Sequence, residues 1–406
     1  MPLHVIDEAK RCLNCKKPMC MEGCPIKTPI PEMIQLFLNG HITDAGEKIF
    51  KNNTLSIVCS LICNHENQCE GHCVLGKKGS AIHISSIENY ISENYFYKLK
   101  NGNVKKNGKK VGIIGAGPAG ITIAVILAQR GYDITIFESK EKIGGVMRYG
   151  IPEFRLPKSI LERYEKKLYE MGIKIRPNTS VGSSISIDDM FRDGYKAIFI
   201  GIGVWKPNTL HIKGETLGNA HYAINYLTNP DVYQLGESVN IIGAGNSAMD
   251  VARTALRHGV KKVTIFSRHD YFAASQREVD YAKIDGVEFL VHMQPIEIVD
   301  EGCIFVELEC DGKGTLTPIA GTEKLYEADS TIIAISQGPK DNATLSTKGI
   351  QVQDNGLLVT NTFGETTRDG IFAAGDVVRG AKTVVEAVAY SKKVADAMDE
   401  YMKSLD

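Results

Sequence analysis

The chain has 406 residues, of which 43% are hydrophobic and 23% charged, and its formal net charge is −1. This length predicts two or three domains that can bury hydrophobic cores. Basic and acidic residues are mixed along the sequence, so no basic stripe indicates nucleic-acid binding. No apolar run reaches the length of a membrane span, and residues 1–11 lack the apolar segment of a secretory signal. We therefore expect a cytoplasmic protein without a membrane association.

Eight of the ten cysteines lie near the N-terminus in two runs, namely Cys12, Cys15, Cys20, Cys24 and then Cys59, Cys63, Cys69, Cys73. In the cytoplasm, closely spaced cysteines bind metals more often than they form disulfides. Structural zinc is one alternative, but only Cys12 and Cys15 have the two-residue gap of a zinc knuckle. The first run ends in Cys24-Pro25, which is typical of iron–sulfur ligation, and we favour that interpretation.

A helical-looking stretch, residues 32–50, separates the two cysteine runs. Folding must bring the runs together, which predicts a small, largely α-helical domain over residues 1–100. A polar segment rich in Lys, Asn and Gly, residues 98–110, follows. Segments of this kind mark domain boundaries.

A dinucleotide-binding fingerprint comes next. An apolar strand runs into Gly115-Ala116-Gly117-Pro118-Ala119-Gly120 and a helix over 121–129, and a second strand, 134–137, ends in Glu138. The glycines allow a tight turn and the close approach of a pyrophosphate to the helix N-terminus. Glu138 can accept a hydrogen bond from a ribose hydroxyl, so strand, turn, helix and acid together predict a dinucleotide site.

The sequence repeats this unit once. A strand beginning at Val239 runs into Gly243-Ala-Gly245-Asn246-Ser247-Ala248 and a helix over 249–257, and the next strand, 263–266, is followed by Arg268 and His269. A basic residue in place of the acid favours the 2′-phosphate of NADP(H). The alternatives are NAD(H) and an Arg268 that is merely solvated on a loop.

A third glycine motif lies near the C-terminus. Gly375-Asp376 follows an expected strand and precedes a helix over 383–402 that begins at Thr383. An acid at this position suits hydrogen bonding to a polyol chain, although glycine–aspartate turns are common.

The segment from Gly144-Gly145-Val-Met-Arg148 to Pro157-Lys158 resembles the signature of the glutamate synthase small-subunit family. The cysteine runs, both fingerprints and the Gly375-Asp376 motif extend the resemblance over nearly the whole chain. This resemblance implies an α/β fold: a helical double [4Fe-4S] domain followed by two dinucleotide-binding domains like those of glutathione reductase. The FAD domain would occupy 110–210 and 328–406, and the NAD(P) domain 211–327.

The resemblance also implies how the ligands divide. Cys12, Cys15, Cys20 and Cys73 would hold one cluster, and Cys24, Cys63, Cys69 and Glu88 the other, leaving Cys59 spare. FAD would lie against the first fingerprint, with Gly145, Arg148, Asp376 and Thr383 around it. NADP(H) would lie against Gly243, Gly245, Asn246, Ser247 and Arg268.

The expected function follows from these cofactors, with no protein acid or base acting as catalytic residue. NAD(P)H would reduce FAD, and electrons would leave singly through the clusters. The favoured acceptor is a larger catalytic subunit, as in glutamate synthase. A dihydropyrimidine dehydrogenase partner, ferredoxin and a stand-alone oxidoreductase remain alternatives. Cys303 and Cys310 are too far apart for a redox-active C-x2-C pair, so thioredoxin-reductase chemistry is not expected.

Overall fold

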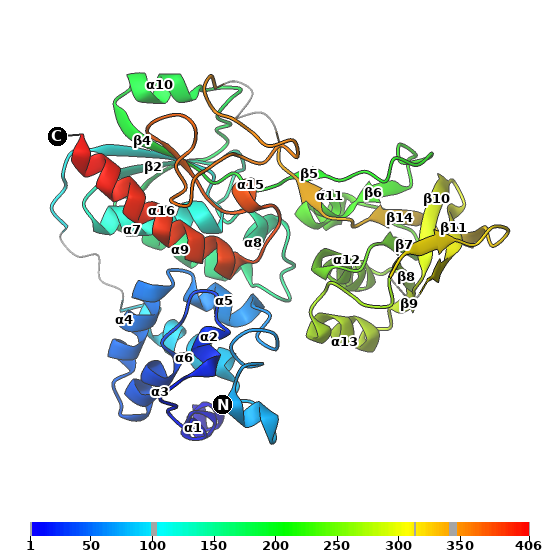
Figure 1. The fold of residues 1–406 in the computed structure, drawn as a ribbon, viewed down its shortest axis with the longest axis horizontal. Coiled ribbons are helices and arrows are strands. Elements are labelled where there is room, and N and C mark those ends of the chain that lie inside the picture. The colour runs from blue at the N-terminus through cyan, green and yellow to red at the C-terminus, as the bar shows by residue number, and fades with distance from the viewer. Residues whose placement is uncertain (1, 99–103, 312–313, 341–346, 406) are drawn as a thin grey trace. The chain divides into compact units, whose positions relative to one another are not determined.

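The computed structural model describes residues 2–98, 104–311, 314–340 and 347–405 (Figure 1). The chain forms two compact units. The first comprises Met1–Arg148, Glu153–Val204 and Pro339–Asp406, and the second comprises Tyr149–Pro152 and Trp205–Gly338. Part of the expected linker at 98–110 lies outside the described residues, and its described remainder has no regular structure before the first strand.

The N-terminal part of the first unit is a helical domain (blue in Figure 1). Its helices are α1 (Pro2–Lys10), α2 (Met19–Glu22), α3 (Ile30–Leu38), α4 (Ile42–Asn52), α5 (Ser56–Ile62), the 3-10 turn η1 (Val74–Lys77) and α6 (Ile84–Phe96). Fully buried isoleucines from α3, α4 and α6 form its core around Ile34, Ile49 and Ile87. At Gly46 a side chain would begin 2.2 Å from Cβ of Tyr95, so glycine lets α4 lie close against α6.

The expected helical stretch over 32–50 is confirmed, and it consists of two helices, α3 and α4. The chain breaks at Asn39-Gly40-His41, where Gly40 has a φ of +80°. Glycine adopts this left-handed conformation without the steric cost that other residues incur, so it ends α3.

The rest of the first unit is built around a parallel sheet with the strand order β16-β4-β1-β2-β3. The strands are β1 (Lys110–Ile114), β2 (Asp133–Phe137), β3 (Lys174–Arg176), β4 (Tyr195–Ile200) and β16 (Ile371–Ala373). The helices are α7 (Pro118–Gln129), α8 (Val146–Tyr149), α9 (Lys158–Glu170), α10 (Ile187–Arg192), α15 (Asp376–Arg379) and α16 (Val384–Ser404). The C-terminal helix α16 packs along α7, so the two ends of this domain's sequence meet at the first fingerprint.

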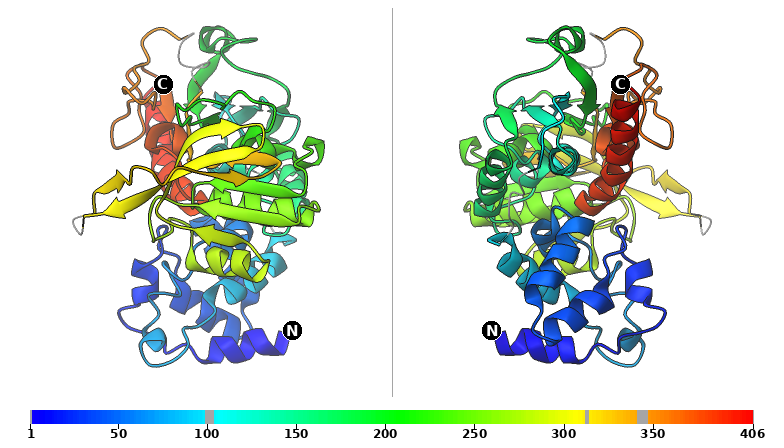
Figure 2. Two further views of the ribbon diagram at one scale, coloured as in Figure 1. Left: turned by 90° about the vertical axis from the view of Figure 1, so that its right-hand side faces the viewer. Right: turned by 90° about the vertical axis from the view of Figure 1, so that its left-hand side faces the viewer.

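The second unit contains another parallel sheet, with the order β6-β14-β7-β8-β9. Its strands are β6 (Ala220–Tyr222), β7 (Ser238–Ile242), β8 (Lys262–Phe266), β9 (Glu288–Leu290) and β14 (Ser330–Ile333), and its helices are α11 (Ala223–Thr228), η2 (Pro230–Val232), α12 (Asn246–Arg257) and α13 (Gln276–Ile284). A four-stranded antiparallel sheet accompanies it (yellow in Figure 2), made of β10 (Met293–Val299), β11 (Gly302–Cys310), β12 (Leu316–Pro318) and β13 (Lys324–Glu327). The short pair β5 (Lys206–Pro207) and β15 (Gln337–Gly338) is antiparallel.

The first unit resumes at Pro339, later than the expected return at 328. The reason is strand pairing: β14, at 330–333, hydrogen-bonds with β6 and β7 and so belongs to the sheet of the second unit. The proposed three-domain division of the chain remains a prediction. Within the described residues, no helix has the length and apolarity needed to cross a membrane.

Candidate cofactor sites

The first fingerprint forms a tight strand–turn–helix. Gly115 has a φ of +98°, and a side chain at Gly120 would begin 2.0 Å from the carbonyl oxygen of Gly115. Gly117 is the N-cap residue of α7, and because glycine has no side chain, it caps none of the first N–H groups of this helix. Exposed amides at a helix N-terminus bind anionic groups such as pyrophosphate.

Two side chains complete this turn. Glu138 is only 6% exposed, and its carboxylate accepts hydrogen bonds from the backbone N–H groups of Ala116 and Lys140, both at 2.8 Å. Arg148 donates from Nε to the carbonyl of Ile143 at 2.8 Å, while its Nη2 is buried without a hydrogen-bond partner. A buried cationic donor without an acceptor costs free energy, so this atom fits an anionic ligand.

The Gly375-Asp376 motif meets the same turn. Gly375 has a φ of +80°, and a side chain there would begin 3.2 Å from Cβ of Ala119. Asp376 accepts from the N–H of Lys382, and burial raises the pKa of its carboxyl to about 7. Thr383 has a structural role, because it caps α16 in a capping box with Glu386. The spacing Thr-x-x-Glu is the sequence signal for such a cap, and it would have identified this role from the sequence.

The second fingerprint lies in the second unit and repeats the geometry. Gly243 has a φ of +117°, and a side chain there would begin 2.4 Å from the carbonyl oxygen of Ala334. Gly245 precedes α12 without a side-chain cap, and Asn246 accepts from the N–H of Ser275 at 3.0 Å. Ser247 follows in the first turn of α12 and is partly exposed.

Arg268, the basic residue predicted to bind the 2′-phosphate of NADP(H), follows the end of β8. Arg268 is exposed, so its guanidinium group is accessible to a ligand. The ring of His269 stacks on that of Tyr271, with the ring centroids 4.8 Å apart. By contrast, Arg253 of α12 is buried and pairs with Glu278 at 2.6 Å and with Asp285 at 3.0 Å. That arginine holds α12 to α13 and the turn that follows it.

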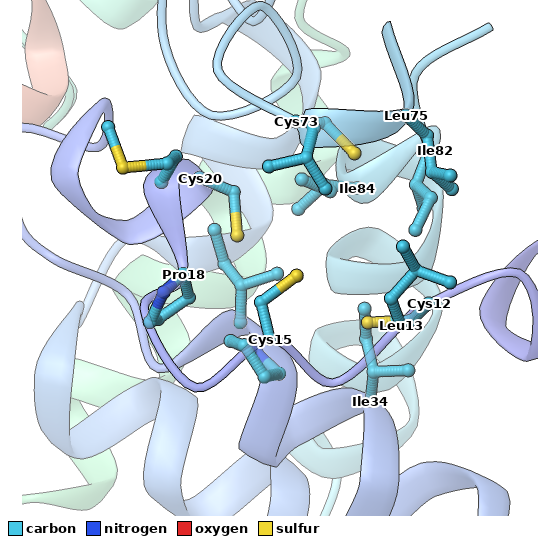
Figure 3. Close-up of a pocket in the computed structure, with 14 residues that line it drawn as sticks. Cys12, Leu13, Cys15, Pro18, Cys20, Ile34, Cys73, Leu75, Ile82 and Ile84 are labelled. Atoms are coloured by element: carbon cyan, nitrogen blue, oxygen red, sulfur yellow. The ribbon is translucent and has the colours of Figure 1, made fainter. Parts of the chain in front are cut away.

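The first predicted cysteine group converges in space. Cys12, Cys15, Cys20 and Cys73 line one pocket, together with apolar residues such as Ile34 and Ile84 (Figure 3). Burial and the neighbouring Cys73 raise the pKa of Cys20 to about 11, and burial also raises the pKa of Cys12. Four thiols around one space, one of them from the distant second run, form a donor set that fits an iron–sulfur cluster.

The second predicted group also converges. The pKa of Cys63 is raised by its hydrogen bond with Cys59, by burial and by Glu88 and Cys69. Burial raises the pKa of Cys69, and the nearby Glu88 and Cys24 add to that shift. Glu88 is 6% exposed, and burial, with Glu70, raises its pKa to about 8.

To ionise and act as a ligand, a buried carboxyl with only a like charge near it needs a compensating cation, which the iron core of a cluster would supply. The donor set of three thiols and one carboxyl therefore fits the predicted second cluster. Cys59 is buried beside Cys63, so the structure does not set it apart from this group. Among the described residues, no three His, Cys, Asp or Glu side chains form a site for a single metal ion.

Hydrogen bonds join the helical domain to the flavin-type domain of the same unit. Lys392 of α16 donates to Asn52 Oδ1 at 2.7 Å, and the amide of Asn52 donates to the carbonyl of Ile26, two residues after Cys24. The hydroxyl of Thr54 also contacts that of Thr122, in the fingerprint helix α7, at 3.3 Å. The segment around Cys24 is thus tied to α16, and residues 52–54 to both nucleotide-domain helices.

Known proteins share both parts of this arrangement. Residues 2–99 match the family model of dihydropyrimidine dehydrogenase domain II, 4Fe-4S cluster, and residues 78–193 and 109–391 match that of pyridine nucleotide-disulphide oxidoreductases. FprA of Mycobacterium tuberculosis, solved in complex with NADPH, has a similar fold, with a TM-score of 0.61, 17% identity and coverage of 73% of this chain and 85% of that chain. The chain is an NAD(P)H-dependent iron–sulfur flavoprotein oxidoreductase, as the resemblance implied.

Two curated relatives align over almost the whole chain. The glutamate synthase [NADPH] small chain of Escherichia coli is 33% identical, over 98% of this chain and 91% of that chain. The NAD-dependent dihydropyrimidine dehydrogenase subunit PreT of Salmonella typhimurium is also 33% identical, over 99% and 95%. The protein belongs to the family of glutamate synthase small chains, which confirms the predicted family and fold class.

Proposed function

We propose that this chain is the electron-input subunit of a larger enzyme. It transfers hydride from NADPH to FAD and delivers single electrons through two [4Fe-4S] clusters to a catalytic partner subunit, most closely as a glutamate synthase small subunit does. Bound FAD supplies the conversion between two-electron and one-electron transfer. The observation that carries the proposal is the coexistence, in one chain, of two converging cysteine groups and two complete nucleotide turns.

In this proposal the residues of the chain bind and orient the cofactors. The N-terminus of α7 and the buried Nη2 of Arg148 hold the FAD pyrophosphate, while Glu138 and Asp376 accept hydrogen bonds from the hydroxyl groups of FAD. Thr383 caps α16 and so positions the start of this helix beside the predicted FAD site. The N-terminus of α12 and Arg268 hold NADPH.

Arg268 decides the nucleotide preference in this proposal. Arg268→Ala is expected to lower kcat/KM for NADPH by about ten- to a hundredfold, because a charge-assisted hydrogen bond is worth about 1.5–3 kcal/mol. The value for NADH should change little, and His269→Ala is the matched control. A kcat/KM in the unaltered protein that is higher for NADH than for NADPH contradicts the NADP assignment.

Glu88 tests the predicted ligand division. In Glu88→Ala, the electron paramagnetic resonance signal and potential of one cluster should change while the other keeps its own. Glu66→Ala, an exchange of a partly buried glutamate in the same domain, is the control. Two native signals with native potentials in Glu88→Ala would show that Glu88 is not a ligand.

A second candidate partner is a dihydropyrimidine dehydrogenase subunit, because PreT matches this chain at the same identity as the glutamate synthase small chain. Purification of the tagged protein from its native host distinguishes the two. A co-purifying glutamate synthase large chain supports the first partner, and a pyrimidine-reducing subunit supports the second. A stable homo-oligomer that reduces acceptors unaided would contradict the proposed need for a partner.

A further inference from the structure

Four lysines adjoin, in the chain, the residues that line the pocket of the first cysteine group. Lys16 and Lys17 lie between Cys15 and Pro18 in the chain. Lys77 is the last residue of the turn η1, which begins directly after Cys73, and Lys78 follows it. Both segments line the pocket, through Cys15, Pro18 and Met19 on one side and Cys73, Val74 and Leu75 on the other. All four lysines are exposed, on segments that line the pocket through their neighbouring residues.

No carboxylate pairs with these four lysines among the described residues. The neighbouring charges pair with one another: Lys10 with Asp7, Arg11 with Glu8, and Lys27 with Glu22. Residues 12–20 and 73–81 contain no Asp or Glu. A local charge of +4 therefore stands on a chain whose net charge is −1.

Apolar side chains lie on the same segments. Leu13 is 61% exposed and Met19 is 46% exposed, and both line the pocket with the cysteines. An exposed apolar centre with a charged margin is the usual composition of a protein-docking surface. We call this surface, formed by Leu13, Lys16, Lys17, Met19, Lys77 and Lys78, the basic rim.

We infer that the basic rim docks the acidic face of a protein that accepts single electrons, an inference that rests on the proposed function. Opposite charge would steer the acceptor to the surface, and the apolar centre would exclude water from the contact. A carrier seated there lies over Cys12, Cys15, Cys20 and Cys73, the thiols closest to it. A cluster held by these thiols would supply one electron to the acceptor, with NADPH as the reductant and no bond made or broken.

The test measures binding of an acidic [2Fe-2S] ferredoxin to the cluster-loaded protein by titration calorimetry. At an ionic strength of about 0.02 M, Lys16→Glu/Lys17→Glu is expected to weaken binding at least about tenfold, as is Lys77→Glu/Lys78→Glu. The matched control is Lys166→Glu/Lys393→Glu, which reverses two exposed charges on α9 and α16 and should stay within about twofold. Raising the ionic strength to about 0.5 M should weaken binding of the wild-type protein by about the same factor as the rim substitutions do at low salt, because the Debye length falls below about 5 Å.

Three results would overturn the inference: no wild-type binding at low salt, equal weakening in rim and control variants, or binding that salt does not change. Binding to vesicles of anionic phospholipid but not to ferredoxin would also overturn it, in favour of a membrane surface. Reduction of the protein's own chromophores by NADPH, without any acceptor, is measured in parallel. Its failure contradicts the proposed function alone, since charge-dependent docking is measured without turnover.

Discussion

Burial of Asp376 makes the stability of the flavin-type domain depend on pH. Its carboxyl has a pKa of about 7 in the folded, flavin-free protein, against an ordinary pKa of 3.8 for an aspartate in water. The folded state therefore holds a proton that the unfolded state has released, and stability falls as the pH rises from about 4 to about 7. Asp376→Asn keeps the shape and the acceptor for the N–H of Lys382 but removes the charge.

The size of the effect follows from the linkage. One pKa unit corresponds to about 1.4 kcal/mol, and the folded carboxyl is itself half ionised at pH 7, so the interval from pH 5 to pH 7 should cost the native protein about 2 kcal/mol. Asp376→Asn has no such proton to release, so its stability relative to the native protein should rise by about 2.5 kcal/mol between pH 5 and pH 8. Asp354→Asn, an exposed aspartate of the same C-terminal segment, should show no such difference.

Hydrogen exchange of peptides from β16 and α16, measured on flavin-free protein at both pH values, reports the opening free energy of this domain. A difference between Asp376→Asn and the native protein that is the same at pH 5 and pH 8 would refute the reasoning. A variant less stable than the native protein at pH 8 would refute it as well. Bound FAD should reduce the difference, because its hydroxyl groups would satisfy the ionised carboxylate.

Two further predictions concern single charged side chains. Arg148→Met should weaken FAD binding by about ten- to a hundredfold, because a charge-assisted hydrogen bond is lost, and the release of flavin fluorescence measures this. Arg192→Met, which replaces an exposed arginine of α10, should leave FAD binding unchanged. Equal release of flavin from the two variants would contradict the role assigned to Arg148. Lys392→Met should lower the midpoint potential of one cluster by roughly 90 mV, since a unit charge at about 8 Å is worth about 2 kcal/mol. Lys393→Met replaces the next residue, which is exposed, and should leave the potentials of both clusters unchanged. A redox titration that shows equal shifts in Lys392→Met and Lys393→Met would exclude this charge effect.

The nucleotide turns could be predicted from the sequence because their signals are local. Gly115 and Gly120 lie within one strand–turn–helix, and so do Gly243 and Gly245, so a few neighbouring residues determine each conformation. The expected helical stretch over 32–50 is confirmed, and Asn39 and Gly40 are the local signal that divides it into two helices. The point at which the chain returns to the first unit could not be predicted from local sequence, because β14 is only four residues long and its sequence does not say with which strands it pairs.

The sequence by itself determined the cofactor chemistry: closely spaced thiols, two glycine turns, an acid after the second strand of one and a base after that of the other. Only the tertiary structure decided which groups share a space. It places Cys73 with Cys12, Cys15 and Cys20, and it buries Glu88 beside Cys63 and Cys69. It also carries Lys392 from the far end of the chain to Asn52, near Cys24. The physical reason is range: backbone turns depend on neighbours in sequence, whereas these groupings depend on the packing of helices that lie far apart in the chain.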